Sequence, residues 1–205
     1  MADVIARHSA LAGLLEPGRV GTGSGDAGVT ISECRDALQL QLIARNGQAG
    51  ALASEVKRHL RRKQALSPLE GAERDGLFIC ATGPHEYWAV ADPRDAAKSV
   101  KALEKIAKGR ASIFDQSDGR FLVHLSGPKA VDALAKGTSL DLGGAALPGE
   151  CGVGTTIEHI PALISRRWLQ GAAMYEVSVP RSYAGSFMTW LEEATREYGA
   201  IAEGD

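Results

Sequence analysis

The sequence predicts an α+β fold built from two related strand–helix–strand–strand–helix units, each with an antiparallel sheet and helices on one face. Segments in which every second residue is apolar predict strands, and they alternate with stretches whose apolar residues recur at helical spacing. Two predicted strands within 77–91 are separated only by turn residues around Gly83 and Pro84, so they return as a hairpin rather than through the crossover helix of a parallel sheet. Segment 88–94 also aligns with segment 175–181, since both read aromatic, valine, proline, arginine before an amphipathic stretch. This likeness indicates a duplication, with chance similarity of two amphipathic segments as the alternative.

The first unit is predicted to span residues 29–110. Leucine alternates with glutamine over 38–42, the pattern of a strand with one face toward water. Apolar residues then follow a helical stripe over 49–60, and the hairpin comes next. Asp92 is expected to cap a second helix over 96–107, because an aspartate followed by proline suits the start of a helix.

The second unit is predicted to span residues 111–205 and to repeat this order. Apolar alternation predicts a strand over 121–125, and the following Ser-Gly-Pro ends it and opens a helix over 128–136. Further strands are predicted near residues 155–160, 162–166 and 174–179, followed by a final helix whose apolar stripe runs from Tyr183 to Tyr198.

Residues 1–28 are predicted to form a flexible arm. Its second half, 18–28, is rich in glycine. These glycines superficially resemble a phosphate-binding loop. We reject that interpretation, because no strand precedes the glycines and no Lys-Ser/Thr pair follows them. The apolar segment 9–15 is expected either to lie on a partner or to form a short helix on its own domain.

The composition is that of an ordinary soluble globular protein, with 44% apolar residues and a formal net charge of −2. That balance disfavours nucleic-acid binding, which usually needs a clearly basic surface. No apolar run approaches the roughly 20 residues that a membrane-spanning helix needs. The first residues are also too polar for a signal peptide, so the expected location is the cytoplasm.

Cysteine and histidine form no recognisable motif in this chain. Cys34, Cys80 and Cys151 lie far apart, which predicts neither a disulfide framework nor a zinc site. No two histidines share the spacing of a metal clamp. His124 is predicted to be a hydrogen-bonded residue on a sheet face, and Cys151 a small residue in a glycine turn. No metal site and no catalytic residue are therefore predicted.

Two blocks of the sequence carry a resemblance to a known family. The block Asp115-Gln-Ser-Asp-Gly-Arg-Phe-Leu-Val-His-Leu-Ser-Gly-Pro-Lys-Ala130 resembles the aminomethyltransferase (glycine-cleavage T-protein) superfamily of folate-binding proteins. The later block Val179-Pro-Arg-Ser-Tyr-Ala184 resembles one branch of it, the gamma subunit of heterotetrameric sarcosine oxidase. The resemblance covers roughly residues 29–200, and it implies the fold of the N-terminal part of aminomethyltransferases.

The resemblance implies a non-catalytic gamma subunit with a structural role in a complex. That complex oxidatively demethylates sarcosine to glycine and yields hydrogen peroxide together with formaldehyde or methylenetetrahydrofolate. Its FAD, FMN, NAD, zinc and tetrahydrofolate are implied to lie in the alpha, beta and delta partner subunits, so no cofactor is expected on this chain. The residues agree with this division, since no G-x-G-x-x-G stands between a strand and a helix.

The resemblance also implies one candidate cofactor-binding residue, Glu176. The folate-binding glutamate of aminomethyltransferases matches Glu176, whereas their Asp-Asp pair matches Asp75-Gly76, so one carboxylate is missing here. Glu176 could therefore hydrogen-bond a pterin edge. Its place on a strand between Tyr175 and Val177 instead favours a solvent-facing side chain.

Two alternatives to the subunit remain open from the sequence. One is a free-standing folate-binding protein of the same superfamily, and the other is an unrelated α+β homo-oligomeric binding module. A subunit of a complex is expected to expose an apolar patch to its partners. Trp168, Trp190 and segment 9–15 are the candidates for that patch.

Overall fold

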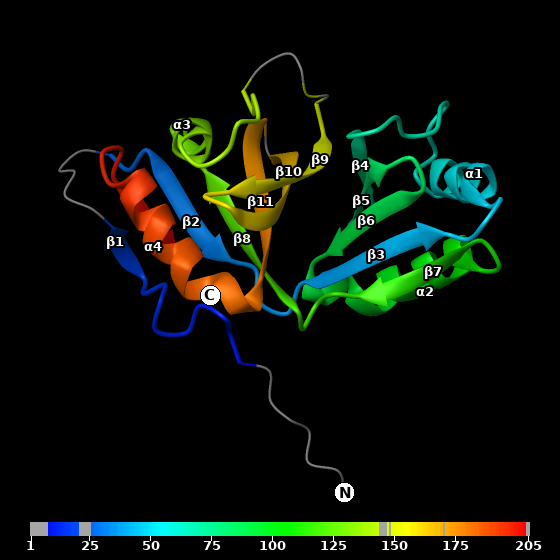
Figure 1. The fold of residues 1–205 in the computed structure, drawn as a ribbon, viewed down its shortest axis with the longest axis horizontal. Coiled ribbons are helices and arrows are strands. Elements are labelled where there is room, and N and C mark those ends of the chain that lie inside the picture. The colour runs from blue at the N-terminus through cyan, green and yellow to red at the C-terminus, as the bar shows by residue number, and fades with distance from the viewer. Residues whose placement is uncertain (1–7, 21–25, 144–146, 148, 170, 204–205) are drawn as a thin grey trace, which may run out of the picture.

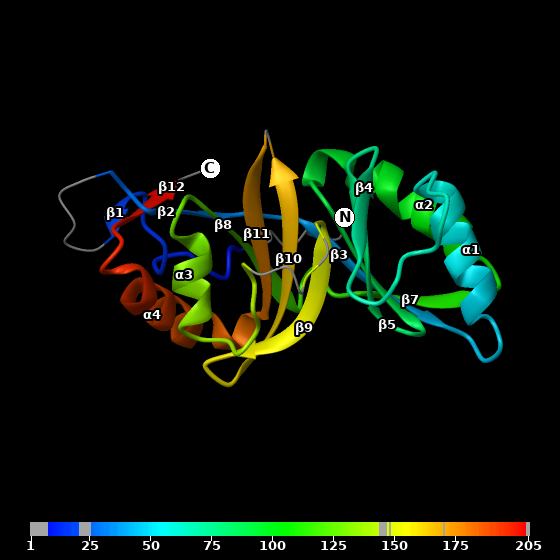
Figure 2. The same ribbon diagram turned by 90° about the horizontal axis from the view of Figure 1, so that it is seen from above.

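The computed structural model describes residues 8–20, 26–143, 147, 149–169 and 171–203. These residues form two lobes side by side, each with one sheet and two α-helices (Figure 1). The helices of each lobe lie on the outer side, so the two sheets turn toward each other in the middle of the molecule (Figure 2). The predicted α+β class is confirmed.

The first lobe holds an antiparallel five-stranded sheet with one face covered by helices. Leu38, Leu40 and Leu42 share one face of their strand and pack against the helices in one apolar core. Its strands, in sheet order, are β4 (Gly71–Arg74), β5 (Leu77–Gly83), β6 (Glu86–Ala91), β3 (Leu38–Ala44) and β7 (Ala111–Asp115), and its helices are α1 (Ala49–His59) and α2 (Ala96–Ala107).

The second lobe holds a seven-stranded sheet. All of its pairings are antiparallel except that between β12 and β2, which is parallel. Its strands, in sheet order, are β1 (Gly18–Val20), β12 (Ala200–Glu203), β2 (Val29–Glu33), β8 (Arg120–Ser126), β11 (Ala172–Pro180), β10 (Ile160–Leu169) and β9 (Cys151–Ile157), and its helices are α3 (Ala130–Ala135) and α4 (Ala184–Thr195).

The internal repeat appears in the order of the elements. Strand, helix, three strands, helix and strand follow one another from β3 to β7 and again from β8 to β12. In both halves a proline leads into a short 3-10 turn, Pro93–Asp95 or Arg181–Tyr183, and then into a 12-residue helix. The Asp92 side chain accepts a hydrogen bond from the Arg94 backbone N–H, so it caps the turn that leads into α2 and not α2 itself, whose N-cap residue is Asp95.

The predicted boundary between the units at residue 110 assigns two strands to a unit whose sheet they do not join. β2 lies in the predicted first unit but pairs with β8 and β12 of the second sheet. β7 lies in the predicted second unit but pairs with β3 of the first sheet. The chain therefore crosses between the lobes twice, after β2 and after β7, which local sequence periodicity does not reveal.

The predicted arm, residues 1–28, is attached to the second lobe where the structure describes it. Leu11 is only 1% exposed and belongs to the core of that lobe, and β1 pairs with β12 along the sheet edge. Segment 9–15 thus packs partly on its own domain. The glycines at 21, 23 and 25 lie outside the described residues.

A third apolar cluster joins the lobes. Phe78, Cys80 and Trp88 of the first sheet contact Leu122 and Leu163 of the second. On the face of β3 predicted to be wet, Ile43 is 37% exposed, but the prediction is wrong for Gln39, which is 1% exposed. It is covered by the second sheet, and its Oε1 accepts a hydrogen bond from the Ser178 hydroxyl.

One glycine allows the sheets to come this close. A Cβ atom on Gly152 of β9 would lie 2.1 Å from the sulfur of Cys80 on β5. Backbone hydrogen bonds cross between the lobes here, from the N–H of Gly71 to the carbonyl of Glu150 and from that of Gly152 to the carbonyl of Leu69. Among the described residues, no helix is long and apolar enough to cross a membrane.

Candidate functional site

A row of polar side chains crosses the second sheet on the face turned toward the first lobe. His124 of β8 stands opposite Glu176 of β11, which stands opposite Ser165 of β10. Directly paired residues of neighbouring strands point to the same side of a sheet. The register therefore brings an imidazole, a carboxylate and a hydroxyl together between the lobes.

Glu176 is the most enclosed member of this row, with 2% of its surface exposed. Its Oε1 accepts a hydrogen bond from Arg167 Nη1 at 2.6 Å and lies 3.4 Å from His124 Nε2. The Arg167 guanidinium also donates to Glu73 on β4, in the other lobe. It lies 5.4 Å from the centre of the Phe78 ring. Arg167 therefore ties the two lobes together through charge.

The protonation states follow from these contacts. Burial raises the pKa of Glu176, but the hydrogen bond from His124 and the charge of Arg167 outweigh it and leave the pKa below its usual value. Burial likewise lowers the pKa of His124, but the thiol of Cys34 and the carboxylate of Glu176 outweigh it and raise the pKa to about 9. At neutral pH the row thus holds a carboxylate next to an imidazolium.

The expectation that Glu176 faces solvent is wrong. Side chains along β11 alternate between two faces as expected. The face that carries Glu176, however, is covered by the first lobe and does not contact solvent. His124 lies on a sheet face as predicted, but its Nε2 meets Glu176 as an ion pair at 3.4 Å and not through a hydrogen bond of good geometry. The partner of Arg167 could not be read from the sequence, because Glu73 is 94 residues away.

The surroundings of Glu176 do not fit a pterin. Oε2 of its carboxylate has no hydrogen-bond partner among the described residues, so one acceptor is chemically free. However, the two cavities described next are lined by other residues. A planar ring that hydrogen-bonded to Glu176 would have to displace the Arg167 contact and the aromatic ring of Phe78.

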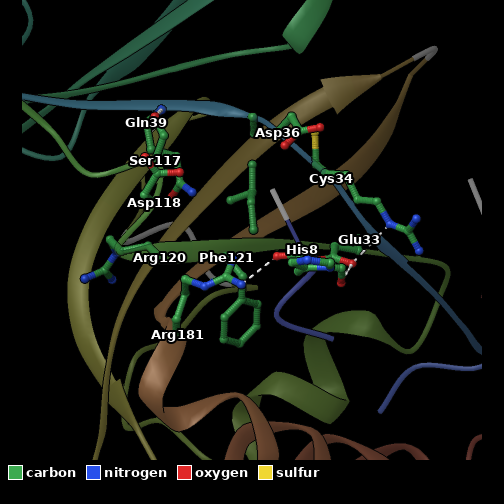
Figure 3. Close-up of a pocket in the computed structure, with 14 residues that line it drawn as sticks. His8, Glu33, Cys34, Asp36, Gln39, Ser117, Asp118, Arg120, Phe121 and Arg181 are labelled. Carbon is green, nitrogen blue, oxygen red and sulfur yellow. Dashed lines mark hydrogen bonds and ion pairs between the residues drawn. The ribbon is translucent and has the colours of Figure 1, made fainter. Parts of the chain in front are cut away.

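A cavity of about 550 Å³ lies where the chain crosses between the lobes (Figure 3). Its walls come from the end of β2 and the link to β3, from the turn before β8, and from residues 8 and 9 of the arm. Arg181 Nη2 donates to the His8 carbonyl at 2.6 Å and holds this part of the arm at the cavity wall. Cys34, a free and half-buried thiol, lines the same space.

A second cavity of about 440 Å³ lies between β3 and β6 of the first lobe and the β9–β10 hairpin of the second. Arg120 lines both cavities. Its guanidinium lies 5.4 Å from the centre of the Trp88 ring and donates to the Ser178 hydroxyl and carbonyl at 2.8 and 2.7 Å. Arg120 therefore separates the two cavities as a fixed polar wall.

The other residues singled out in the sequence lie apart from this row. Cys151 is the first residue of β9 and is buried, so its predicted place in a glycine turn is wrong. Asp75 occupies the turn between β4 and β5 and pairs with the neighbouring Arg74 at 3.3 Å. Trp168 is 52% exposed, as expected for a partner surface, whereas Trp190 packs against Phe187 of its own core.

Comparison with protein families gives one match, to residues 63–204, by the family described as the GCVT N-terminal domain. The aminomethyltransferase of Saccharopolyspora erythraea is 28% identical over 184 residues, which are 89% of this chain and 48% of that protein. Sarcosine oxidase subunit gamma of Corynebacterium sp. (strain P-1) is 27% identical over 180 residues, which are 87% of this chain and 85% of that protein. The chain thus spans about half the length of the aminomethyltransferase and most of the gamma subunit.

Solved structures share the fold. Heterotetrameric sarcosine oxidase from Corynebacterium sp. U-96, in complex with pyrrole 2-carboxylate, contains a chain that matches with a TM-score of 0.70 and 22% identity, covering 94% of this chain and 96% of that one. Aminomethyltransferase T of the glycine cleavage system from Bartonella henselae matches with a TM-score of 0.63 and 19% identity, covering 87% of this chain and 48% of that one.

Proposed function

Because the chain belongs to the GCVT N-terminal domain family, we propose that it is a non-catalytic, gamma-type subunit of a heterotetrameric sarcosine oxidase. The complex oxidatively demethylates sarcosine to glycine, with hydrogen peroxide and either formaldehyde or methylenetetrahydrofolate as the other products. The partner subunits alpha, beta and delta carry FAD, FMN, NAD, zinc and tetrahydrofolate. This chain contributes structure to the assembly and binds none of these groups.

The observation that carries the proposal is the enclosure of Glu176. In the resemblance to aminomethyltransferases this is the position of a folate-binding carboxylate. Here the carboxylate is 2% exposed and is neutralised by Arg167 and His124. If the buried Glu176 carboxylate turned toward a ligand, it would lose its contacts with both charged partners. Breaking such a buried ion pair strongly destabilises a protein. The arrangement supports a structural use of a residue with a binding role in relatives.

Two further features support a role in assembly. The likeness to gamma subunits extends over most of their length, whereas the likeness to aminomethyltransferases extends over about half. Large apolar side chains are also exposed on the surface, which is typical of proteins with a partner. They are Leu14, Ile43, Phe114, Trp168, Leu169, Tyr183 and Ile201.

Co-expression with and without this chain tests the proposal. The alpha, beta and delta subunits of a sarcosine oxidase from the same genome are produced with a tag on the largest chain. We expect the full complex to elute as one species only when this chain is present. We also expect the isolated chain to be colourless and inactive toward sarcosine. Sarcosine oxidation by the isolated chain would contradict the proposal.

A free-standing folate-binding protein is the second candidate, and the unpartnered Oε2 of Glu176 is the observation in its favour. Calorimetric titration of the isolated chain with tetrahydrofolate separates the two. The subunit proposal predicts no heat of binding. Binding that is lost in Glu176→Gln, with the circular dichroism spectrum unchanged, would favour the second candidate. An unrelated binding module is incompatible with the family membership of the chain.

A further inference from the structure

Cys34 lies on the same face of the second sheet as the polar row. Its backbone N–H donates to the carbonyl of Leu122 at 2.9 Å, which extends the β2–β8 ladder by one residue beyond β2. In that ladder Ser32 stands opposite His124. Residues two apart on a strand point to the same side, so the thiol of Cys34 and the imidazole of His124 are diagonal neighbours.

The three groups stand in the order thiol, imidazole, carboxylate. His124 lies between Cys34 and Glu176, and both raise its pKa against the opposing effect of burial. Asp92, at the end of β6, also faces this imidazole, and the charge of His124 contributes to lowering the pKa of Asp92. An imidazolium next to a cysteine stabilises the negative charge that develops on sulfur as the thiol gives up its proton, and the thiolate is the nucleophilic form. A carboxylate behind the imidazole orients it, as in cysteine and serine nucleophile sites on unrelated folds.

The thiol also has access to solvent. Cys34 is half-buried and lines the cavity of about 550 Å³ (Figure 3). Cys80 and Cys151 are buried, and burial raises the pKa of both thiols. The chain therefore offers one accessible cysteine and two inert ones of its own as internal controls.

The cavity lining indicates the class of molecule that reaches Cys34. Guanidinium groups and carboxylates line it in equal number, which leaves little net charge to attract an anion or a cation. The polar walls suit a small uncharged molecule that can hydrogen-bond. These charged residues are Arg35, Arg120 and Arg181 on the one side and Glu33, Asp36 and Asp118 on the other.

We propose that Cys34 is a covalent modification site, a nucleophilic cysteine that reacts with small uncharged electrophiles entering this cavity, with His124 as its positioning residue. In the reaction the sulfur lone pair forms a bond to the electrophilic carbon. The leaving group departs with the electron pair of its own bond. The thiol proton passes to solvent, while the imidazolium of His124 keeps its own proton and stabilises the negative charge on sulfur.

Iodoacetamide is the probe for this site, since its iodide leaves as the S–C bond forms. Peptide mapping by mass spectrometry follows each cysteine separately at neutral pH. We expect Cys34 to react at least about tenfold faster than Cys80 and Cys151 in the folded chain. We also expect it to react faster in the folded chain than in the urea-unfolded chain at the same pH. A folded rate equal to or below the unfolded rate would overturn the proposal, because a half-buried cysteine without activation is only shielded.

Two variants locate the source of the reactivity. His124→Gln removes the imidazolium and is expected to slow alkylation of Cys34 by about tenfold. His85→Gln, in the exposed turn between β5 and β6, is the matched control and is expected to leave the rate unchanged. Protection of Cys80 reports whether each variant is folded. An unchanged alkylation rate of Cys34 in folded His124→Gln would also contradict the proposal. If that variant fails to fold, the comparison of the folded and unfolded wild-type chain still tests the proposal.

Discussion

At the scale of single residues, Glu176 and Arg167 form a buried ion pair at the interface between the lobes. A buried ion pair is not in itself strong evidence of stability, because desolvation offsets much of the attraction. The cost appears when one partner is removed, since the other charge then stays buried alone. Arg167 is the partner that also reaches across to Glu73, so its loss removes contacts in both lobes.

Arg167→Met is therefore expected to lower the free energy of unfolding by about 3 kcal/mol, because Glu176 is left with only His124 as a charged partner. Adding Glu176→Gln should recover part of that loss. Urea unfolding followed by circular dichroism measures both variants. Arg94→Ala, which removes an exposed pair with Asp92, is the control and is expected to change nothing measurable. Strictly additive losses in the double variant would contradict a coupled pair.

The pKa of His124 predicts a pH dependence of stability. Because folding raises this pKa from 6.5 to about 9, its contribution is fully present below pH 6.5 and is lost as the pH rises through about 9. A shift of that size corresponds to about 3 kcal/mol. Urea unfolding of wild type and His124→Gln across this range isolates the effect, since lysines and tyrosines titrate equally in both. A constant difference from pH 6 to 10 would exclude the imidazolium.

Glu176 acts in the opposite direction. Its pKa is lowered from 4.5 on folding, so its contribution is present above pH 4.5 and is lost as the pH falls below that value. Glu176→Gln should therefore be less stable than wild type at neutral pH and approach it in acid. Thermal unfolding at several acidic pH values measures the convergence. A gap that stays constant down to acid unfolding would show that the carboxylate is protonated throughout.

At the scale of elements, the contact between β5 and β9 sets how closely the lobes approach. Gly152 faces the Cys80 sulfur with no room for a Cβ atom, whereas Gly154 on the same strand has open space at that position. Both are strand glycines without a positive φ. Gly152 is buried and Gly154 is exposed, so the pair compares the same substitution on one strand inside and outside the contact.

Gly152→Ala is expected to destabilise the chain by about 1–3 kcal/mol, because the added methyl group forces the sheets apart. Gly154→Ala is expected to be neutral or slightly stabilising. In the Cys80→Ala background, the cost of Gly152→Ala should fall, since the sulfur is gone. Differential scanning calorimetry of the four proteins provides the test. Equal effects of the two glycine substitutions would contradict the proposed packing.

The same scale shows what the sequence could predict. Alternation and helical stripes located β3, β8, α2 and α4, because each has a buried face of its own. The short β4, with the sequence Gly-Ala-Glu-Arg, has no such pattern and was not predicted. Resemblance identified Glu176, but neither its burial nor its partner Arg167 could be read from the sequence, since both depend on the contact between lobes.

At the scale of the whole molecule, the outer surface leaves one apolar face of the first sheet uncovered near its β7 edge. The helices cover the opposite face, and the second lobe covers β5, β6 and the start of β3 on this one. Ile43 and Phe114 lie on the remaining part, diagonal to one another across the β3–β7 ladder. We expect this surface to contact a larger chain of the oxidase, because exposed aromatic anchors concentrate binding energy.

Phe114→Ser tests that expectation. It should weaken association with the partner chains by about tenfold or more, while the circular dichroism spectrum and the unfolding temperature of the isolated chain stay unchanged. Lys105→Ser on the exposed side of α2 is the control and should bind like wild type. Association is measured by surface plasmon resonance with the alpha, beta and delta subunits immobilised. Wild-type binding by Phe114→Ser would place the contact elsewhere.

The central proposal is that this chain works as a non-catalytic member of a larger assembly. Purification of the tagged chain from its native host, followed by size-exclusion chromatography and mass identification, is the test. We expect a single species in which this chain is stoichiometric with larger, flavin-bearing chains, and a colourless product when the chain is expressed alone. A lone chain that carries flavin or oxidises sarcosine by itself would contradict it.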